Sequence, residues 1–166
     1  MAILIALPLL GALLVFQSAV VSRVPLLHGT ADLILLAIIA WALQKRVQTA
    51  WHWGIIGGLL VSFTSAVPFG VVLGGYLFAV GLALALRSRV WQVPSLAMLV
   101  TTFFGSMTAH LITLLVLRLS GVSLPWLQTL NMVILPSVFL NLLLALPFYI
   151  FLGDLARWLY PEELEM

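Results

Sequence analysis

Only one acidic side chain lies within the apolar part of this chain. Asp32 is the sole Asp or Glu before residue 154, and it follows Gly29-Thr30 at the start of an apolar run. An acid in such a run can relay protons or bind a ligand. A carboxylate at a helix N-terminus can instead accept hydrogen bonds from the exposed N–H groups. We expect this structural role for Asp32, with Arg23 and His28 close enough in sequence to be its partners.

His110 lies in the middle of a long apolar stretch that also carries several hydroxyl groups. A metal site would need further nitrogen, sulfur or carboxylate ligands at helical spacing, and none accompanies His110; the chain has no cysteine. Ser106, Ala109 and Thr113 recur at spacings of three and four, which is typical of helices that pack closely or share hydrogen bonds. The pattern predicts helix packing here, with a ligand pocket as the alternative.

No arrangement of side chains typical of an active site stands out. Paired carboxylates occur only at Glu162 and Glu163, in an acid-rich end of the chain that is better explained by solvation. The sequence has no glycine loop of the phosphate-binding type and no evident Ser/His/Asp set. We therefore expect no enzymatic activity, no cofactor and no metal site. The net charge of +2 is too small to predict nucleic-acid binding.

Small residues provide the second spacing signal. Two pairs of glycines, each four residues apart, occur between residues 54 and 74, and such pairs let helix backbones approach closely. Two serines between the pairs can add interhelical hydrogen bonds. We hypothesise a contact with a partner's membrane helix through Gly54, Gly58, Ser62, Ser65, Gly70 and Gly74. The alternative is that these faces pack against each other inside the bundle.

Composition identifies the environment in which these residues act. Of the 166 residues, 64% are hydrophobic and 7% are charged, whereas soluble domains carry roughly 25% charged residues. The apolar runs are continuous over about 20 residues, as in membrane-spanning helices, rather than alternating as in barrel strands. The sequence therefore predicts an all-α integral membrane protein with a single transmembrane domain.

Six apolar runs are expected to form a six-transmembrane-helix bundle. We expect the spans at about 3–21, 30–43, 54–67, 71–86, 95–117 and 127–152, and a short tail over 153–166. The first run lacks the basic start of a signal peptide, so we expect it to be retained. The alternative for the third and fourth runs is one re-entrant hairpin, because the third is short and Pro68 divides the pair. In the tail, Leu155, Trp158 and Leu159 share one face, which predicts an amphipathic turn at the membrane surface.

The basic residues predict the orientation. Six spans would place five basic residues on one side of the membrane, and two, Arg23 and Arg118, on the other. The side richer in Lys and Arg is normally cytoplasmic, so both termini are expected in the cytoplasm. The five residues on that side are Lys45, Arg46, Arg87, Arg89 and Arg157.

Several stretches resemble the MreD family of rod shape-determining membrane proteins. Residues 58–70, GLLVSFTSAVPFG, look like the family signature, in which a glycine and leucines precede an acid and a Ser-Gly-Ser-Pro-Leu-Gly-like turn. Residues 32–36 followed by Lys45-Arg46 are similar to the family's second span. Its last span is resembled by Pro136-Ser137, Asn141, Ala145, Pro147 and Tyr149. Ser62 stands where many members carry aspartate, so no role of that acid is carried over.

The resemblance implies a non-enzymatic scaffold of the bacterial cell-elongation machinery in the inner (cytoplasmic) membrane. The implied partners are MreC through its membrane helix, the filament protein MreB, the RodA/penicillin-binding protein pair that builds peptidoglycan, and membrane lipid. The family is also thought to resemble the six-span substrate-binding subunits of energy-coupling-factor vitamin transporters. The alternative function is therefore small-molecule binding for transport. It would require outer-half polar residues to converge, and the candidates are His28, Asp32, Ser65, Arg118 and Gln128.

Overall fold

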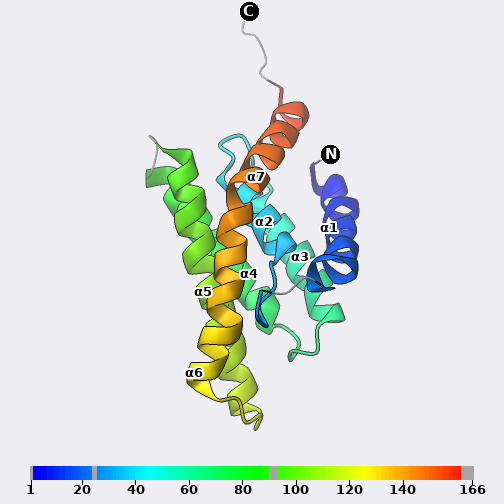
Figure 1. Ribbon diagram of the computed structural model, residues 1–166. Coiled ribbons are helices and arrows are strands. Elements are labelled where there is room, and N and C mark those ends of the chain that lie inside the picture. Colours follow the sequence, from blue (N-terminus) through cyan, green and yellow to red (C-terminus); the bar gives the residue numbers. More distant parts are fainter. Residues whose placement is uncertain (1, 24–25, 90–92, 162–166) are drawn as a thin grey trace, which may run out of the picture.

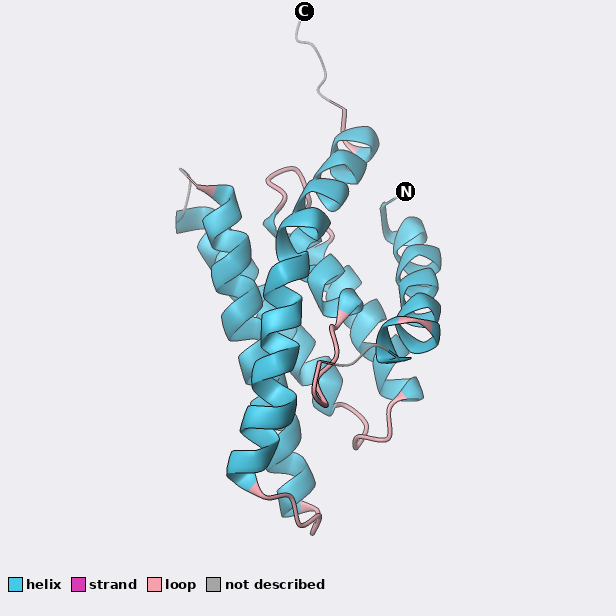
Figure 2. Ribbon diagram, viewed as in Figure 1, coloured by secondary structure: helices cyan, strands magenta, loops and turns pink. Residues whose placement is uncertain are grey.

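The computed structural model describes residues 2–23, 26–89 and 93–161. Within these residues the secondary structure is helical, apart from an isolated bridge between Leu26 and Gly29, which confirms the all-α prediction (Figure 1, Figure 2). In chain order the elements are α1 (Ala2–Ala19), the 3₁₀ turn η1 (Val21–Arg23), α2 (Leu33–Leu43), α3 (Ala50–Thr64), α4 (Val71–Arg89), α5 (Pro94–Leu119), α6 (Trp126–Thr129), the π-helical turn η2 (Leu130–Ile134) and α7 (Leu135–Leu159).

Within the part of the chain that the structure describes, four helical segments are long and apolar enough to cross a membrane. They are Ala2–Arg23, Val71–Ser88, Pro94–Leu119 and Trp126–Leu159. The expected second and third spans correspond to shorter helices, α2 with 11 residues and α3 with 15. At 1.5 Å per residue they are about 16 and 22 Å long, below the roughly 30 Å of a bilayer's hydrocarbon core. Four of the six expected spans therefore contain a helix long and apolar enough to cross, and the six-span bundle stays a prediction.

The short helix α2 lies at the centre of the bundle. All eleven of its residues are buried, and it packs against α1, α3, α4, α5 and α7. A helix that is apolar on every side is stable when it is surrounded by protein or by lipid. In α2 the neighbours are protein throughout, and α7 runs across it along the length of the molecule (Figure 1).

Glycines let the helix backbones pack closely, α3 against α2 and α4 against α5. A Cβ added at Gly57 would lie 2.6 Å from Ile38 Cδ1 in α2, and one added at Gly75 would lie 2.9 Å from Ala109 Cβ in α5. Such distances leave room only for glycine unless the neighbours move. The packing of Ala109 confirms that this part of α5 serves helix contacts. α3 and α4 are two separate helices that pack together and are joined by a turn at Gly70, whose φ is +90°.

The first part of the expected tail is helical. α7 passes Gly153 without a break and ends at Leu159. Whether the residues from 153 onward lie outside the membrane stays a prediction. Leu155 and Leu159 pack against the core, while Trp158 is 73% exposed. Glu162 and Glu163 lie outside the described residues.

The start of α1 and the end of α7 lie at the same end of the molecule (Figure 1). Four of the five basic residues expected on the cytoplasmic side, Lys45, Arg46, Arg87 and Arg157, line one cavity at the end of α7. The side chain of Arg89 lies outside the described part of the structure. Which face of the membrane this end occupies stays a prediction.

Candidate functional site

The N-terminus of α2 begins inside the bundle, where its first N–H groups need protein partners. The Asp32 carboxylate accepts a hydrogen bond from the Leu35 N–H (2.9 Å) as the helix N-cap. The side-chain oxygen of Gln17 accepts from the Leu33 N–H (2.7 Å), and that of Asn141 accepts from the N–H of Asp32 itself (2.7 Å). The N-cap role expected for Asp32 is confirmed.

These capping groups belong to a larger polar cluster. The Tyr76 hydroxyl of α4 donates to Asp32 Oδ2 (2.6 Å), and the Asn141 amide of α7 donates to Ser106 Oγ in α5 (2.9 Å). The Nδ1 of His110 lies 2.8 Å from the Ser106 carbonyl, which can only accept, so this nitrogen carries the proton. Side chains of α1, α4, α5 and α7 thus converge on the first turn of α2. The hydrogen bond made by Ser106 confirms the packing role expected for its helix.

The partners expected for Asp32 were different. Its carboxylate is bonded to Leu35 and Tyr76, not to the sequence neighbours Arg23 and His28, because the chain before α2 is fixed through its backbone instead. Tyr76 and Gln17 were missed, although each is a polar side chain in a mostly apolar run. That is the sequence signal by which they could have been found.

The loop before α2 is held tightly against α7. A Cβ at Gly29 would lie 2.6 Å from the Ser137 nitrogen and 2.7 Å from the Val133 oxygen, so backbone meets backbone at this glycine. The next residue, Thr30, donates its N–H to Ser137 Oγ (3.1 Å). Irregular backbone is tolerated at membrane depth where protein satisfies its polar groups. Here α7 provides that satisfaction.

A proline in α7 creates one of the acceptors that this loop uses. Pro136 has no N–H, so the carbonyl of Met132, four residues earlier, loses its helical donor. The N–H of His28 donates to that carbonyl at 3.0 Å. The π-helical turn η2, which ends just before Pro136, is thus joined to the loop through the same group. The π-helical turn before α7 and the loop that leads into α2 are therefore held together by this hydrogen bond.

The C-terminal end of α2 is held by an arginine. Nη1 of Arg87 in α4 donates to the carbonyls of Ala42 (3.2 Å), Gln44 (2.9 Å) and Val47 (2.9 Å). Carbonyls at a helix C-terminus lack helical donors and attract a positive charge. In the sequence analysis, Arg87 served only as one of the basic residues that predict the orientation in the membrane. In the structure it also fixes the end of the buried helix.

The first pair of glycines in the expected partner contact lies within the bundle. A Cβ at Gly54 would be 2.9 Å from Val80 Cγ2, and one at Gly58 would be 2.7 Å from Leu73 Cδ1, so both glycines face α4. Ser62 is 6% exposed, and its hydroxyl has no hydrogen-bond partner among the described residues. For these three residues the structure shows internal packing, the alternative left open by the sequence.

The remaining three residues lie at or beyond the turn between α3 and α4. Ser65 ends α3 and accepts a hydrogen bond from the Val67 N–H (3.2 Å). Gly70 forms the turn, and a Cβ there or at Gly74 would meet nothing within 4 Å. The six residues therefore do not share one surface. The partner contact stays a prediction, and Gly74 is its exposed helical position.

The polar residues considered for small-molecule binding are also dispersed. His28 and Gln128 line a cavity of about 270 Å³ beside α6. Asp32 is engaged in capping α2, and Ser65 is engaged in its turn. Arg118 lies in the last turn of α5 and is not among the residues that line this cavity.

Comparison with protein-family models, with curated proteins and with solved structures gives no match to this chain.

Proposed function

We propose that this chain is a non-enzymatic membrane scaffold of the bacterial cell-elongation machinery, as its resemblance to the MreD family implies. In this role it binds MreC and links it to MreB and to RodA with its penicillin-binding protein. The structural observation that supports a scaffold is the use of the polar side chains inside the bundle. Asp32, Tyr76 and Asn141 form hydrogen bonds at the start of α2, and none of the three lines the cavities of about 400 and 270 Å³.

A scaffold needs a framework of fixed shape, and the capped central helix provides one. Arg87 at one end of α2 and the Asp32 cluster at the other tie α1, α4 and α7 to it, and α5 is joined to the cluster through Asn141. A carrier would instead need polar groups that are available to a ligand. Since the carboxylate of Asp32 already has a donor at each oxygen, the arrangement favours the scaffold over the vitamin-carrier alternative.

The proposed contact for the membrane helix of MreC is the exposed face of α4 at Gly74. Phe78 lies one turn further along this face and is 47% exposed. A small residue beside a large aromatic one leaves a shallow depression on the helix surface. A second helix can pack into this depression. Helices in lipid associate through such close packing, because hiding apolar area from lipid gains little.

Three glycine variants test this contact: Gly74→Leu, Gly58→Leu and Gly11→Leu. Gly74 and Gly11 are both open, so leucine at either should leave the melting temperature in detergent unchanged; at Gly58 it should lower it, because Leu73 already fills the space. Co-purification with MreC should be lost for Gly74→Leu and kept for Gly11→Leu. A stable Gly74→Leu protein that still binds MreC would rule out this face. Release of a stoichiometric small molecule from the unfolded wild type would favour the carrier.

We also propose that the protein lies in the bacterial inner membrane with six spans and both termini in the cytoplasm. The support is the clustering of Lys45, Arg46, Arg87 and Arg157 at the end where α1 starts and α7 ends. A reporter fused after Glu165 should be cytoplasmic, and one inserted at Val122 should be external. The opposite pair of results would contradict the orientation.

A further inference from the structure

A cavity of about 400 Å³ opens at the end of the bundle where α2 and α7 end. Its walls come from the segment that follows α2, the last turns of α4, the first turns of α5 and the final third of α7. It shares no residue with the polar cluster at the start of α2. Cavities of roughly 300–1,000 Å³ are typical of sites for small ligands.

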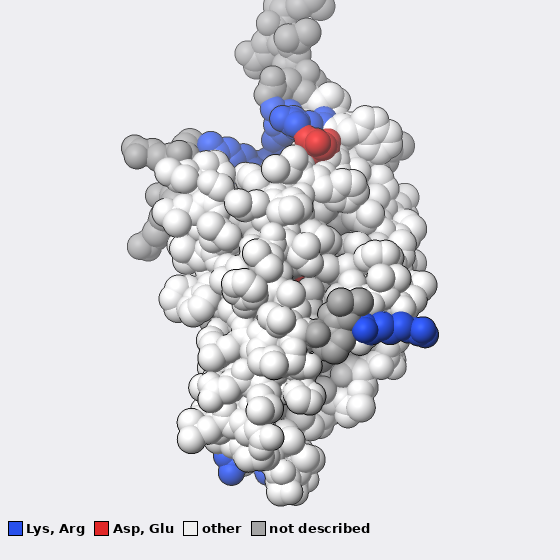
Figure 3. Space-filling model, viewed as in Figure 1, with Lys and Arg blue, Asp and Glu red and all other residues white. Residues whose placement is uncertain are grey.

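The rim of this cavity is strongly basic. Among the described residues, the charged side chains that line it are those of Lys45, Arg46, Arg87, Arg157 and Asp154. Arg46 also donates to the Tyr160 carbonyl (3.1 Å). The space-filling view shows Lys and Arg side chains gathered at this end of the molecule beside a small acidic area (Figure 3). A cavity whose wall carries the guanidinium groups of Arg87 and Arg157 favours an anionic ligand.

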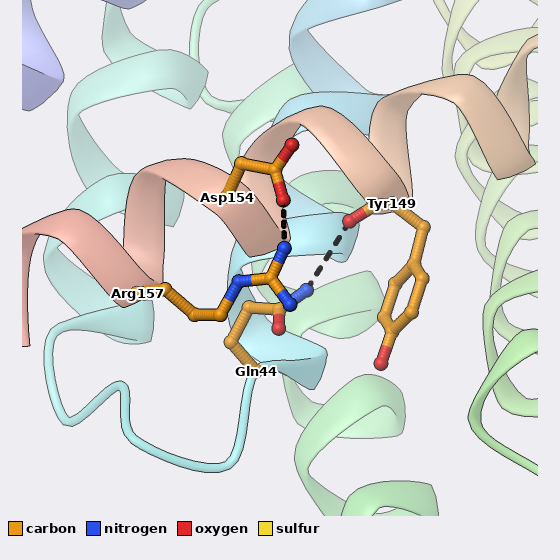
Figure 4. Close-up of polar contacts among 4 residues, drawn as sticks. All are labelled: Gln44, Tyr149, Asp154 and Arg157. Carbon is orange, nitrogen blue, oxygen red and sulfur yellow. Dashed lines mark hydrogen bonds and ion pairs between the residues drawn. The ribbon is translucent and has the colours of Figure 1, made fainter. Parts of the chain in front are cut away.

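Two of the arginines are held in place by the surrounding structure. Arg87 is bonded to three backbone carbonyls, which fix its guanidinium at the wall without neutralising its charge. Arg157 is paired with Asp154 one turn earlier in α7, and the Gln44 amide is bonded to the carbonyl of Tyr149 (Figure 4). An entering anion therefore meets a fixed charge at Arg87 and competes with Asp154 for Arg157.

Behind the charged rim the lining is apolar. Leu43 of α2, Ala97 of α5 and Ile150 of α7 contribute to it. Ile150 is also 64% exposed on the outer surface of α7, so the cavity is continuous with the apolar surface of the bundle. A charged rim beside an apolar wall matches an amphiphile whose charged group lies next to hydrocarbon chains.

The geometry points to a binding site for the phosphate headgroup of an anionic phospholipid, with its acyl chains along the surface of α7 beside Ile150. Basic pockets between membrane helices on the cytoplasmic side are a recurrent form of headgroup site. Arginine suits this ligand, because its planar group of donors matches phosphate oxygens. The inference does not rest on the proposed scaffold role.

Thermal melting of the purified full-length chain in a neutral detergent tests the site. Mixed micelles with phosphatidylglycerol should raise the melting temperature, and the same fraction of phosphatidylcholine should not, because binding only the folded state stabilises it. High salt should reduce the shift. Equal shifts with both lipids would overturn the proposal. An equal shift with inorganic phosphate alone would overturn the lipid source and leave a soluble phosphate ligand.

Charge variants at the rim locate the site. Arg157→Gln should weaken phosphatidylglycerol binding about fivefold, the loss expected for one surface cation. Asp154→Asn should strengthen it, because Arg157 is then released to the lipid. The matched control is Arg118→Gln, at the other end of α5, which should bind like the wild type. Equal weakening by Arg118→Gln and Arg157→Gln, or weaker binding by Asp154→Asn, would assign the effect to general surface charge and overturn the site.

Discussion

The helices α1 and α2 have nearly the same kind of sequence and opposite positions in the molecule. Both are mostly apolar and neither contains a charged residue. In α2 all eleven residues are buried, whereas the described part of α1 buries only Ala2, Ala6 and Leu10 among its eighteen. Figure 1 shows α1 at one side of the bundle and α2 within it.

The difference lies at the ends of the two helices. Lipid is as apolar as leucine, so composition alone does not decide whether a helix faces lipid or protein. The ends of α2 are bound by side chains of other helices, Gln17 and Asn141 at the start and Arg87 at the finish. At the start of α1 the Trp53 indole of α3 donates to the Ala2 carbonyl (3.2 Å), and near its end Ser22 bonds to the Gln17 carbonyl in an exposed position. The central helix differs in having side chains of other helices bonded at both of its ends.

The largest effect is expected from breaking the entry into α2. Gly29→Val should prevent recovery of folded protein, because its Cβ would meet two backbone atoms of α7 at 2.6 and 2.7 Å that cannot move aside. Gly11→Val in α1 is the control, since a Cβ there meets nothing within 4 Å. Yield of monodisperse protein and its melting temperature measure both. A stable Gly29→Val protein would show that the loop is not fixed against α7.

A smaller effect is expected from removing the cap. Asp32→Ala should cost about 2–4 kcal/mol, from the lost N-cap bond and from the Tyr76 hydroxyl left without its acceptor. Asp32→Asn keeps an acceptor for Leu35 and places an amide donor beside the Tyr76 oxygen, so it should cost less than 1 kcal/mol. Reversible unfolding in detergent measures both variants. If Asn were as damaging as Ala, the charge of Asp32 would matter beyond capping, as in a proton or ligand role.

The smallest effects are expected from shortening one leucine in α2 and one in α1, which compares the two helices directly. Leu36→Ala in α2 should destabilise the bundle by about 2 kcal/mol, because its side chain is fully buried and leaves a cavity. Leu4→Ala in α1 should change stability by less than about 0.5 kcal/mol, because Leu4 is 77% exposed. Melting of the two variants under one set of conditions provides the test. Equal losses would mean that the exposed face of α1 has a protein neighbour.

Local features of the fold could be predicted, and long-range ones could not. Asp32 before an apolar run indicates a helix start, since its capping bond reaches only three residues along the chain. Its other partners lie far away: Tyr76 is 44 residues distant, and Asn141, which binds the Asp32 N–H, is 109. No spacing rule links such positions. The depth of α2 follows from those contacts and so escaped prediction.

The glycines of the expected partner contact also show what the sequence could predict and what it could not. A spacing of four indicates where a backbone can be approached, but not by which helix. Gly58 is covered by Leu73 of the same chain, whereas Gly74 is open. The polarity of a lone side chain such as Asn141 does indicate an inward position, because lipid offers it no partner. Which groups it meets there depends on the rotation of α7.

The π-helical turn η2 makes chain length, rather than side-chain identity, the sensitive property of one short segment. A π turn spaces its hydrogen bonds five residues apart instead of four, so it holds one residue more than a regular turn. Deleting one residue within 130–134 would restore a regular helical turn, because the residue removed is the extra one that the π turn holds. Inserting one residue would instead add about 100° of rotation between α6 and α7. Ser137 and Asn141 could then keep their bonds to the α2 entry only if α6 and the loop before it turned instead. Along 130–134 a deletion should thus be tolerated more readily than an insertion.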